Sequence, residues 1–293
     1  IKIKYRKETY MKKTKTIISA SRRTDLPAFY YDWLQRIFKK GEVELRNQIY
    51  PERQYSVNLG RESVGAVVLW SKNFKHFADD PGVFKDYNMY FQYSINNYST
   101  KLEPNVPTFT ETLKTLEKMR KNYSDKFFNI RFDPIIISKY GEIIPDENKP
   151  GKARLQAFEN LCKNLKELDF KDCRITTSYV SLYGSIENTL RKLNIGYIPL
   201  SVKEQLLFFE RMTDIAKQYG FTVYSCADKV LESVNGMKKG SCIDGKLLSE
   251  LFGEKFTSSK DSSQRETCGC TKSRDIGSYL QPCRHMCKYC YAR

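Results

Sequence analysis

The sequence contains few histidines and no long apolar run. His76 and His285 are its two histidines, so a hydrolytic metal site made of histidines or a Cys–His nucleophile pair has almost no support. No apolar run approaches the ~18 residues that a membrane-spanning helix needs. The apolar stretch IISAS near the start is too short and too polar for a signal peptide. These absences favour a cytoplasmic protein without a membrane partner.

The composition is that of a globular protein with an excess of positive charge. Hydrophobic residues make up 40% of the 293 residues, enough for a sizeable core. The 50 Lys and Arg residues exceed the 34 Asp and Glu residues, which favours either a nucleic acid or an anionic small molecule as partner. Residues 1–16 contribute +6 of the net +16, so residues 1–15 are interpreted as a basic flexible arm.

Strand-like and helix-like patterns alternate along residues 16–230. Short runs rich in apolar and β-branched residues predict six strands, at 16–20, 66–70, 89–95, 127–132, 174–180 and 221–226. Apolar residues at helical spacing predict helices at 32–40, 108–120, 152–168 and 203–220. This order predicts parallel strands in an α/β fold, as a partial (β/α)6 TIM-like barrel or a doubly wound sheet.

Three segments depart from this alternation. Residues 43–63 are expected to form an inserted hairpin, and residues 184–200 an inserted helix and loop. Residues 231–293 are rich in Gly, Ser, Lys and Cys. We expect this last segment to be rich in loops, to be held by metal rather than by a core, and to pack on the barrel rim.

Charged and polar residues follow the predicted strands. In parallel α/β folds the chemistry lies at the carboxyl ends of the strands, and we call this side of the sheet the carboxyl edge. Six residues there are candidates for catalysis: Arg22, Arg23, Asp25, Lys72, Arg131 and Asp133. Trp70 and Asn73 are candidates for binding a cofactor. Asp25, which precedes Leu-Pro, also suits an N-terminal helix cap.

Nine cysteines are many for a protein of this size, and they fall into three groups. Cys162 and Cys173 lie in predicted core positions and are interpreted as structural. Cys283, Cys287 and Cys290 form a C-x3-C-x2-C pattern. A zinc site would leave one of these three surplus or borrow a ligand elsewhere, and the fourth cysteine followed by proline of ferredoxin-type sites is absent. Three thiolates on a four-iron cluster leave one iron open.

The C-x3-C-x2-C pattern resembles the signature of the radical S-adenosylmethionine (SAM) superfamily. The fuller string CxHxCxYCYA, which includes His285, Tyr289, Tyr291 and Ala292, is similar to the version in spore photoproduct lyase and its relatives. From Met11 onward the chain also resembles an uncharacterised bacterial family, recorded only as a domain of unknown function. The segments that carry this second resemblance are SRRTDLPAFY, VVLWSKN and CGCTKSRDIGSYLQPCRHMCKYCYA.

The superfamily resemblance implies an activity. Cys283, Cys287 and Cys290 would bind a 4Fe–4S cluster, and SAM would chelate the fourth iron. Reductive cleavage of SAM would release a 5′-deoxyadenosyl radical that takes hydrogen from an unidentified small-molecule substrate, and the reaction needs an electron donor. Tyr289 would pack near the adenine, and His285 would hydrogen-bond near the cluster.

The sequence differs from the superfamily pattern in two respects. The cysteine loop follows the last strand instead of the first, as in a circular permutation, and the chain has no Gly-Gly pair to hold the amino group of SAM. Such a loop could still reach the carboxyl edge, since the first and last strands of a barrel are neighbours.

The remaining cysteines suggest a second metal site. Cys226, Cys242, Cys268 and Cys270 could hold an auxiliary iron–sulfur cluster or a zinc ion, or they could be unrelated thiols. Two alternatives to a radical enzyme remain open. One is a noncatalytic nucleic-acid-binding protein stabilised by zinc or an iron–sulfur cluster, and the other is nonradical chemistry at the open iron. The charged residues at the carboxyl edge favour the radical enzyme, because a binding protein needs no converging acid–base set there.

Overall fold

A parallel eight-stranded sheet forms the centre of the molecule. The computed structural model describes residues 14–47, 50, 52–138, 151–182 and 184–290. Its strand order is β10-β1-β4-β5-β6-β7-β8-β9, and each neighbouring pair is parallel. The strands are β1 Thr16–Ala20, β4 Val64–Ser71, β5 Met89–Ser94, β6 Phe128–Arg131, β7 Arg174–Thr177, β8 Val223–Cys226, β9 Lys238–Gly240 and β10 Arg274–Asp275.

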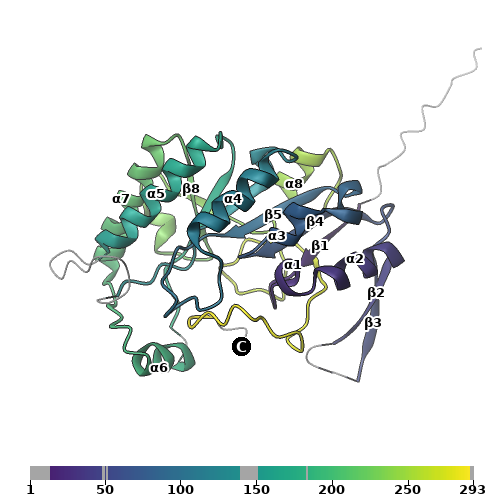
Figure 1. The fold of residues 1–293 in the computed structure, drawn as a ribbon, viewed down its shortest axis with the longest axis horizontal. Helices are drawn as coiled ribbons and strands as arrows, with labels where there is room; N and C mark the ends of the chain where they lie inside the picture. Colours follow the sequence, from purple (N-terminus) through teal and green to yellow (C-terminus); the bar gives the residue numbers. More distant parts are fainter. Residues whose placement is uncertain (1–13, 48–49, 51, 139–150, 183, 291–293) are drawn as a thin grey trace, which may run out of the picture.

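Helices connect these strands, as the alternating pattern predicts. They are α1 Leu26–Phe29, α2 Tyr31–Lys40, α3 Lys75–Asp79, α4 Phe109–Arg120, α5 Lys152–Glu167, α6 Gly184–Lys192, α7 Val202–Gln218 and α8 Gly245–Phe252, with short 3-10 helices at Gly82–Asp86, Asp125–Phe127 and Leu231–Ser233. Ser201 and Glu204 form a capping box at the start of α7, so local sequence fixes where this helix begins. Figure 1 shows α3, α4, α5 and α7 together on one side of the sheet.

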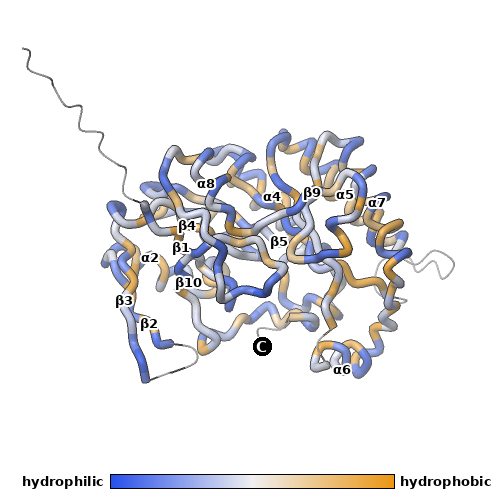
Figure 2. Tube along the Cα trace, turned by 180° about the vertical axis from the view of Figure 1, so that it is seen from behind, coloured by the Kyte–Doolittle hydropathy of each residue, from blue (hydrophilic) through white to orange (hydrophobic). Residues whose placement is uncertain are grey.

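The two faces of the sheet have different coverings. Side chains such as Val67, Leu69 and Phe91 point toward the helices and belong to the main apolar core. Alternate residues of the same strands, including Ala66 and Val68, point the other way, as the two-residue period of a strand requires. We call this second side the inner face. It is covered by the chain from Cys242 to Cys270, which Figure 2 shows from behind.

The six expected strands and four expected helices are confirmed, the tail is rich in loops as expected, and the expectation that it lacks a core of its own is wrong. Residues 231–293 add two more strands, since β9 pairs with β8 and β10 pairs with β1. They also contain α8, and Ile243, Leu248 and Phe256 pack on the inner face. The tail is therefore not a loop segment that lacks a core. Within the described residues no pairing joins β9 to β10, so the sheet is open there.

The two inserted segments are confirmed. Strands β2 Glu42–Arg46 and β3 Gln54–Asn58 form an antiparallel hairpin, separate from the main sheet. Helix α6 starts the second insertion. Most of the basic arm, residues 1–13, lies outside the described residues. None of the helices in the described part of the chain combines the length and apolar character needed to cross a membrane.

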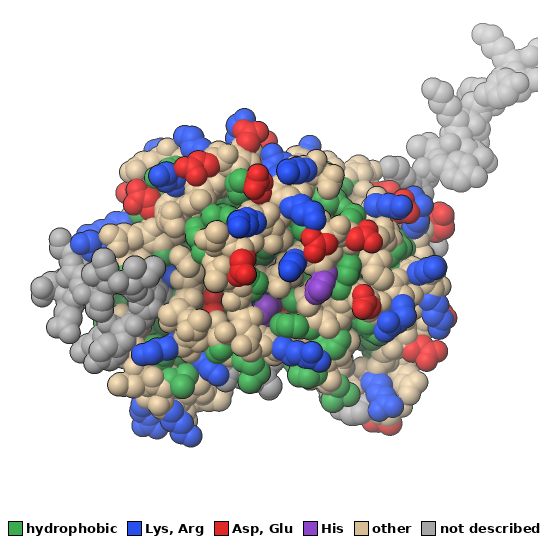
Figure 3. All heavy atoms as spheres, viewed as in Figure 1, with side chains coloured by type: hydrophobic (Ala, Val, Ile, Leu, Met, Phe, Trp, Pro, Cys, Tyr) green, Lys and Arg blue, Asp and Glu red, His purple; other side chains and the backbone are tan. Residues whose placement is uncertain are grey.

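Charges of both signs share the surface. Figure 3 shows Lys and Arg side chains interspersed with Asp and Glu side chains over the helices on one face. Lys118 on α4 and Asp79 on α3, for example, form an exposed ion pair of 2.7 Å. Much of the positive charge on this face therefore lies beside negative charge, which weakens any long-range attraction for a polyanion.

Candidate metal and cofactor site

The loop with Cys283, Cys287 and Cys290 lies across the carboxyl edge. We call residues 283–290 the cysteine loop. In Figure 1 it is part of the yellow segment on the lower side of the molecule, and it runs between α1 and α6. The backbone N–H of Lys288 donates to the carbonyl of Leu102 over 2.8 Å. The Asn105 side chain donates to the carbonyl of Arg284 over 2.7 Å. Because Leu102 and Asn105 follow β5, these bonds hold the cysteine loop beside the end of that strand.

His285 attaches the cysteine loop to the end of β1. Its side chain is 2% exposed. Its Nε2 lies 2.9 Å from Asp25 Oδ2, and its Nδ1 lies 2.9 Å from the carbonyl oxygen of Asn105. Both neighbours are hydrogen-bond acceptors, so both ring nitrogens are used by the protein itself. The structure places His285 against Asp25 and Asn105, and its expected hydrogen bond near a cluster stays a prediction.

Asp25 is a buried carboxylate shared by three chain segments. Its Oδ1 accepts from the Ala28 N–H over 3.0 Å, which confirms the expected cap of α1. The Ser71 hydroxyl donates to the same oxygen over 2.7 Å, and the Lys72 N–H donates to Oδ2 over 2.8 Å. Together with His285, these bonds tie α1, the end of β4 and the cysteine loop to one side chain.

Tyr289 makes a second buried attachment. Its hydroxyl donates a short hydrogen bond to Glu103 and accepts one of 2.8 Å from the Asn96 side chain. Lys72 Nζ lies 2.7 Å from Glu103 Oε1, so the Glu103 carboxylate binds both the Lys72 ammonium and the Tyr289 hydroxyl. Burial alone would raise the pKa of Glu103, but the Lys72 ammonium and the hydrogen bonds from Lys72, Tyr289 and Asn96 together outweigh it and hold that pKa below its usual range. Burial raises the pKa of Tyr289 well above its usual range.

The three thiols lie close enough to influence one another electrostatically. Burial raises the pKa of Cys283 to about 11 and the pKa of Cys287 to about 12, and each is raised further by Cys290. Thiols with such values stay protonated at neutral pH unless a cation stabilises the thiolate. An iron–sulfur centre would supply that cation, so the type of the donors fits such a centre. Their positions as described are not those of a ready metal site, since within the described part of the chain no group of three or more His, Cys, Asp or Glu is placed to hold an ion.

The other four cysteines also come together. Cys226 ends β8, Cys242 follows β9, and Cys268 and Cys270 come from the last part of the tail. Cys226 Sγ and Cys242 Sγ are 3.3 Å apart. The side chain of Cys270 lies near both Cys242 and Cys268. We call these four residues the four-thiol cluster.

Arg131 and Arg22 lie beside the four-thiol cluster. Arg131 Nη1 donates to Cys242 Sγ over 2.6 Å, and the Arg22 guanidinium, whose Nη1 donates to the Ser273 hydroxyl over 3.4 Å, lies near Cys270. Both guanidinium groups lie over the Trp70 ring, at 5.4 Å for Arg22 and 5.3 Å for Arg131. Neighbouring thiols lower the pKa of both Cys226 and Cys270, and the charges of Arg131 and Arg22 respectively lower them further.

The expected carboxyl-edge residues thus divide between the two cysteine sites. Asp25, Lys72, His285 and Tyr289 surround the cysteine loop, whereas Arg22, Trp70, Arg131 and Asp133 lie around the four-thiol cluster, where Asp133 accepts short hydrogen bonds from Arg131 and Ser178. Arg23 instead donates to the carbonyl of Gly277 over 2.9 Å and pairs with Asp275 over 3.5 Å. The Asn73 side chain accepts a hydrogen bond from the Lys75 N–H at the turn before α3. Its observed side-chain bond is therefore to this turn and not to either cysteine site.

Two residues that each bind several partners, Glu103 and Asp275, were not predicted from the sequence. Glu103 lies in a loop after β5, away from any strand end that the pattern could mark. Asp275 accepts hydrogen bonds of 2.9 Å from Ser19 and 2.7 Å from Ser21, and one of 2.9 Å from the Arg22 N–H. It therefore fixes β10, which leads into the cysteine loop, beside β1. Tyr291 and Ala292 of the expected motif lie outside the described residues.

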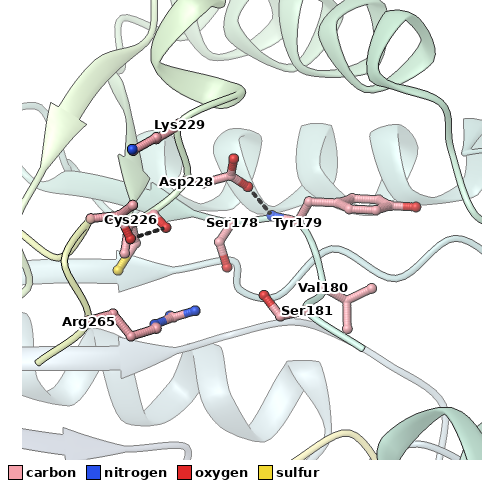
Figure 4. Close-up of a pocket in the computed structure, with 10 residues that line it drawn as sticks. Ser178, Tyr179, Val180, Ser181, Cys226, Asp228, Lys229 and Arg265 are labelled. Carbon is pink, nitrogen blue, oxygen red and sulfur yellow. Dashed lines mark hydrogen bonds between the residues drawn. The ribbon is translucent and has the colours of Figure 1, made fainter. Parts of the chain in front are cut away.

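A cavity of about 340 Å³ opens next to the four-thiol cluster. It is lined by residues that follow β7 and β8 and by two residues of the tail: Ser178, Tyr179, Val180, Ser181, Cys226, Ala227, Asp228, Lys229, Arg265 and Thr267. Figure 4 shows the guanidinium end of Arg265 pointing toward Ser178 and Ser181. Asp228 is used structurally, because it accepts from the Val230 N–H over 3.1 Å and from the Tyr179 N–H over 3.4 Å. The cavity therefore offers cationic and hydroxyl groups to a ligand.

Comparison with known proteins identifies the family of this chain, but the family description names no activity. A search of curated proteins found no match. One similar solved structure is a "putative alpha-L-fucosidase" from Bacteroides thetaiotaomicron VPI-5482, which is 12% identical over 86% of this chain and 90% of that chain, with a TM-score of 0.30. A likeness this weak supports no argument about fold or function. The family described as "Domain of unknown function (DUF1848)" matches residues 17–292, and the chain belongs to that family.

Proposed function

We propose that the protein is a radical SAM-type iron–sulfur enzyme whose 4Fe–4S cluster is held by Cys283, Cys287 and Cys290. The observation that carries the proposal is the position of the cysteine loop. It lies at the carboxyl edge of a parallel sheet, where α/β enzymes bind their ligands. Two buried side chains, His285 and Tyr289, hold it there. A cluster on this loop would therefore stand beside the strand ends.

The arrangement of the strands also supports a permuted radical SAM fold. The cysteine loop comes last in the chain, but β10 before it pairs with β1. The loop therefore reaches the same place as a loop that follows a first strand. The open parallel sheet with helices on its outer side is compatible with a partial barrel.

In the proposed enzyme the cluster, when bound, would supply the electron that cleaves SAM to methionine and a 5′-deoxyadenosyl radical. The role of the protein is to position the reactants. Asp25 and Lys72 hold the cysteine loop, and we therefore assign them positioning roles rather than proton transfer. The cavity beside Arg265 and Lys229 is the proposed place for a substrate that carries an anionic group.

The proposal is tested by iron content and SAM cleavage. The protein is purified anaerobically, reconstituted with iron and sulfide, reduced and mixed with SAM. We expect the wild type to form 5′-deoxyadenosine. The variant Cys283→Ala/Cys287→Ala/Cys290→Ala should form none and should lose about four irons per chain.

Cys162→Ala is the matched control, because Cys162 is a fully buried thiol on α5 that belongs to neither cysteine site. It should keep both the iron and the reaction. Wild-type protein that binds no iron, or that binds iron and leaves SAM intact after reduction, would refute the proposal. The first of these outcomes would favour a noncatalytic binding protein, and the second nonradical chemistry at the cluster.

A further inference from the structure

The four-thiol cluster joins segments that are far apart in the sequence. It combines the end of β8 with three thiols of the tail, on the inner face where Ile243 and Leu248 also pack. Cys242 is 5% exposed and Cys270 is 2% exposed. Cys226 Sγ and Cys242 Sγ are in hydrogen-bond contact, and Cys270 lies near both Cys242 and Cys268, which lower its pKa. Cys226 and Cys268 are partly buried, and the four side chains as described are not yet arranged around an ion. Four thiols gathered at the junction of sheet and tail nevertheless point to a common ligand.

The spacing of the sulfur atoms distinguishes between the candidate metals. Four thiolates around a single zinc ion, with Zn–S bonds of about 2.3 Å in a tetrahedron, have sulfur atoms about 3.8 Å apart. In a four-iron cluster each thiolate binds a different iron, so the sulfur atoms stand much further apart. The 3.3 Å between Cys226 Sγ and Cys242 Sγ is close to the zinc spacing. These two sulfur atoms now share a hydrogen bond. If a zinc ion took the place of its proton, the two sulfur atoms would have to move apart by about half an ångström.

The surrounding charges also match a zinc ion. Zinc with four thiolates has a net charge of −2, which is costly to bury unless cations lie nearby. Arg131 supplies a positive charge in contact with Cys242, and Arg22 supplies a second one near Cys270. The Ile243 N–H points at Cys270 Sγ over 3.3 Å, as backbone donors do in the outer shell of metal–thiolate sites.

We propose that Cys226, Cys242, Cys268 and Cys270 bind one Zn²⁺ ion that holds the tail on the inner face of the sheet. All four ligands come from the protein, so the site is closed and structural. Binding releases the protons that remain on the thiols, and neither the thiols nor the zinc change oxidation state. The site goes beyond the proposed function and does not depend on it, since it shares no ligand with the cysteine loop.

The experiment measures metal in a protein that lacks the cysteine loop thiols. The variant Cys283→Ser/Cys287→Ser/Cys290→Ser is purified with its metal, and zinc, iron and sulfide are counted per chain. The zinc is then exchanged for Co²⁺. We expect one zinc per chain and the ligand-field spectrum of cobalt bound by four thiolates.

Two further changes in this background identify the ligands. Adding Cys270→Ser should reduce bound zinc at least tenfold at limiting free Zn²⁺. Cys268→His should keep one ion with a shifted cobalt spectrum, because histidine also binds zinc and cobalt. Cys173→Ser is the matched control, since Cys173 is a buried thiol outside the cluster.

Three outcomes would overturn the zinc site. They are iron with sulfide in place of zinc, a protein without metal whose Cys226 and Cys242 form a disulfide, and zinc that survives Cys270→Ser. Each of these outcomes is measured in protein that lacks the cysteine-loop thiols, and it does not depend on whether the wild type cleaves SAM. A failed zinc site and a failed radical enzyme are therefore separate results.

Discussion

Asp25 shows how much of the site depends on one side chain. Its two carboxylate oxygens accept from Ala28, Ser71 and Lys72 and contact His285, at distances of 2.7 to 3.0 Å. The residue is 7% exposed, so water cannot replace these partners. The same residue caps α1, positions the end of β4 and holds the cysteine loop. Removing its charge should therefore affect all three together.

Asp25→Asn is the mildest test of this arrangement. The amide has nearly the same volume, but it replaces one acceptor oxygen by an NH2 group that faces other donors. We expect the free energy of unfolding to fall by about 2–4 kcal/mol and hydrogen exchange to increase in residues 283–290. The exposed Asp80→Asn is the control and should change stability by less than about 0.5 kcal/mol. Unchanged exchange in the cysteine loop would contradict the role given to Asp25.

The sequence located the residues of this site better than it located their partners. Positions at strand ends follow from the parallel fold, which is why Asp25, Lys72 and Arg131 were identified. Their contacts depend on how the tail folds back over the sheet, and no local pattern encodes that. Glu103 and Asp275 were missed for this reason, although both hold several partners.

At the scale of elements, apolar periodicity predicted the long helices and strands, whereas the eight-residue helix α8 in the tail was not predicted. The helices α5 and α7 have apolar faces over several turns, and β4 has eight residues. By contrast, β9 has three residues, Lys-Lys-Gly, and β10 has two, Arg-Asp. Strands so short and polar carry no two-residue pattern. Only their pairing with β8 and β1 makes them strands.

Asp125 secures one connection between elements, the loop from α5 to β7. Its Oδ2 accepts hydrogen bonds of 2.6 Å from the backbone N–H groups of Lys171 and Asp172. Burial alone would raise the pKa of Asp125, but these N–H groups outweigh it and hold the pKa below its usual range. The folded pKa thus lies below the unfolded value of about 3.9. The carboxylate stabilises the fold above that value, and its contribution is lost as the pH falls through the folded pKa.

Asp125→Asn should therefore have an effect that depends on pH. At pH 7 we expect it to lower the free energy of unfolding by about 1–3 kcal/mol. The difference from the wild type should shrink as the pH falls through the folded pKa, because the wild-type side chain then becomes neutral too. Urea unfolding at a series of pH values measures this. Asp172→Asn, at an exposed neighbouring position, should show no such trend, and a constant difference for Asp125→Asn would exclude the mechanism.

At the scale of the whole molecule, the tail is an integral part of the sheet, because it contributes the two outermost strands, β9 and β10. One helix layer covers the outer face, and the inner face is covered by the last part of the chain. Gly65 in β4 lies at a close approach between the inner face and the tail. A Cβ built there would lie 2.4 Å from Phe256 Cε1 and 2.8 Å from Lys15 Cβ. Only glycine leaves room for the Phe256 ring at this point.

Gly65→Ala should therefore push the tail off the inner face. We expect the free energy of unfolding to fall by about 1–3 kcal/mol, the usual range for overpacking. Gly184→Ala is the matched control, because a Cβ at Gly184 meets nothing within 4 Å. If the clash with Phe256 causes the loss, Gly65→Ala should cost less in a Phe256→Ala background, and a double-mutant cycle measures that coupling. Strictly additive effects would mean that the tail does not pack on β4 as described, and would remove the physical basis for a metal site between tail and sheet.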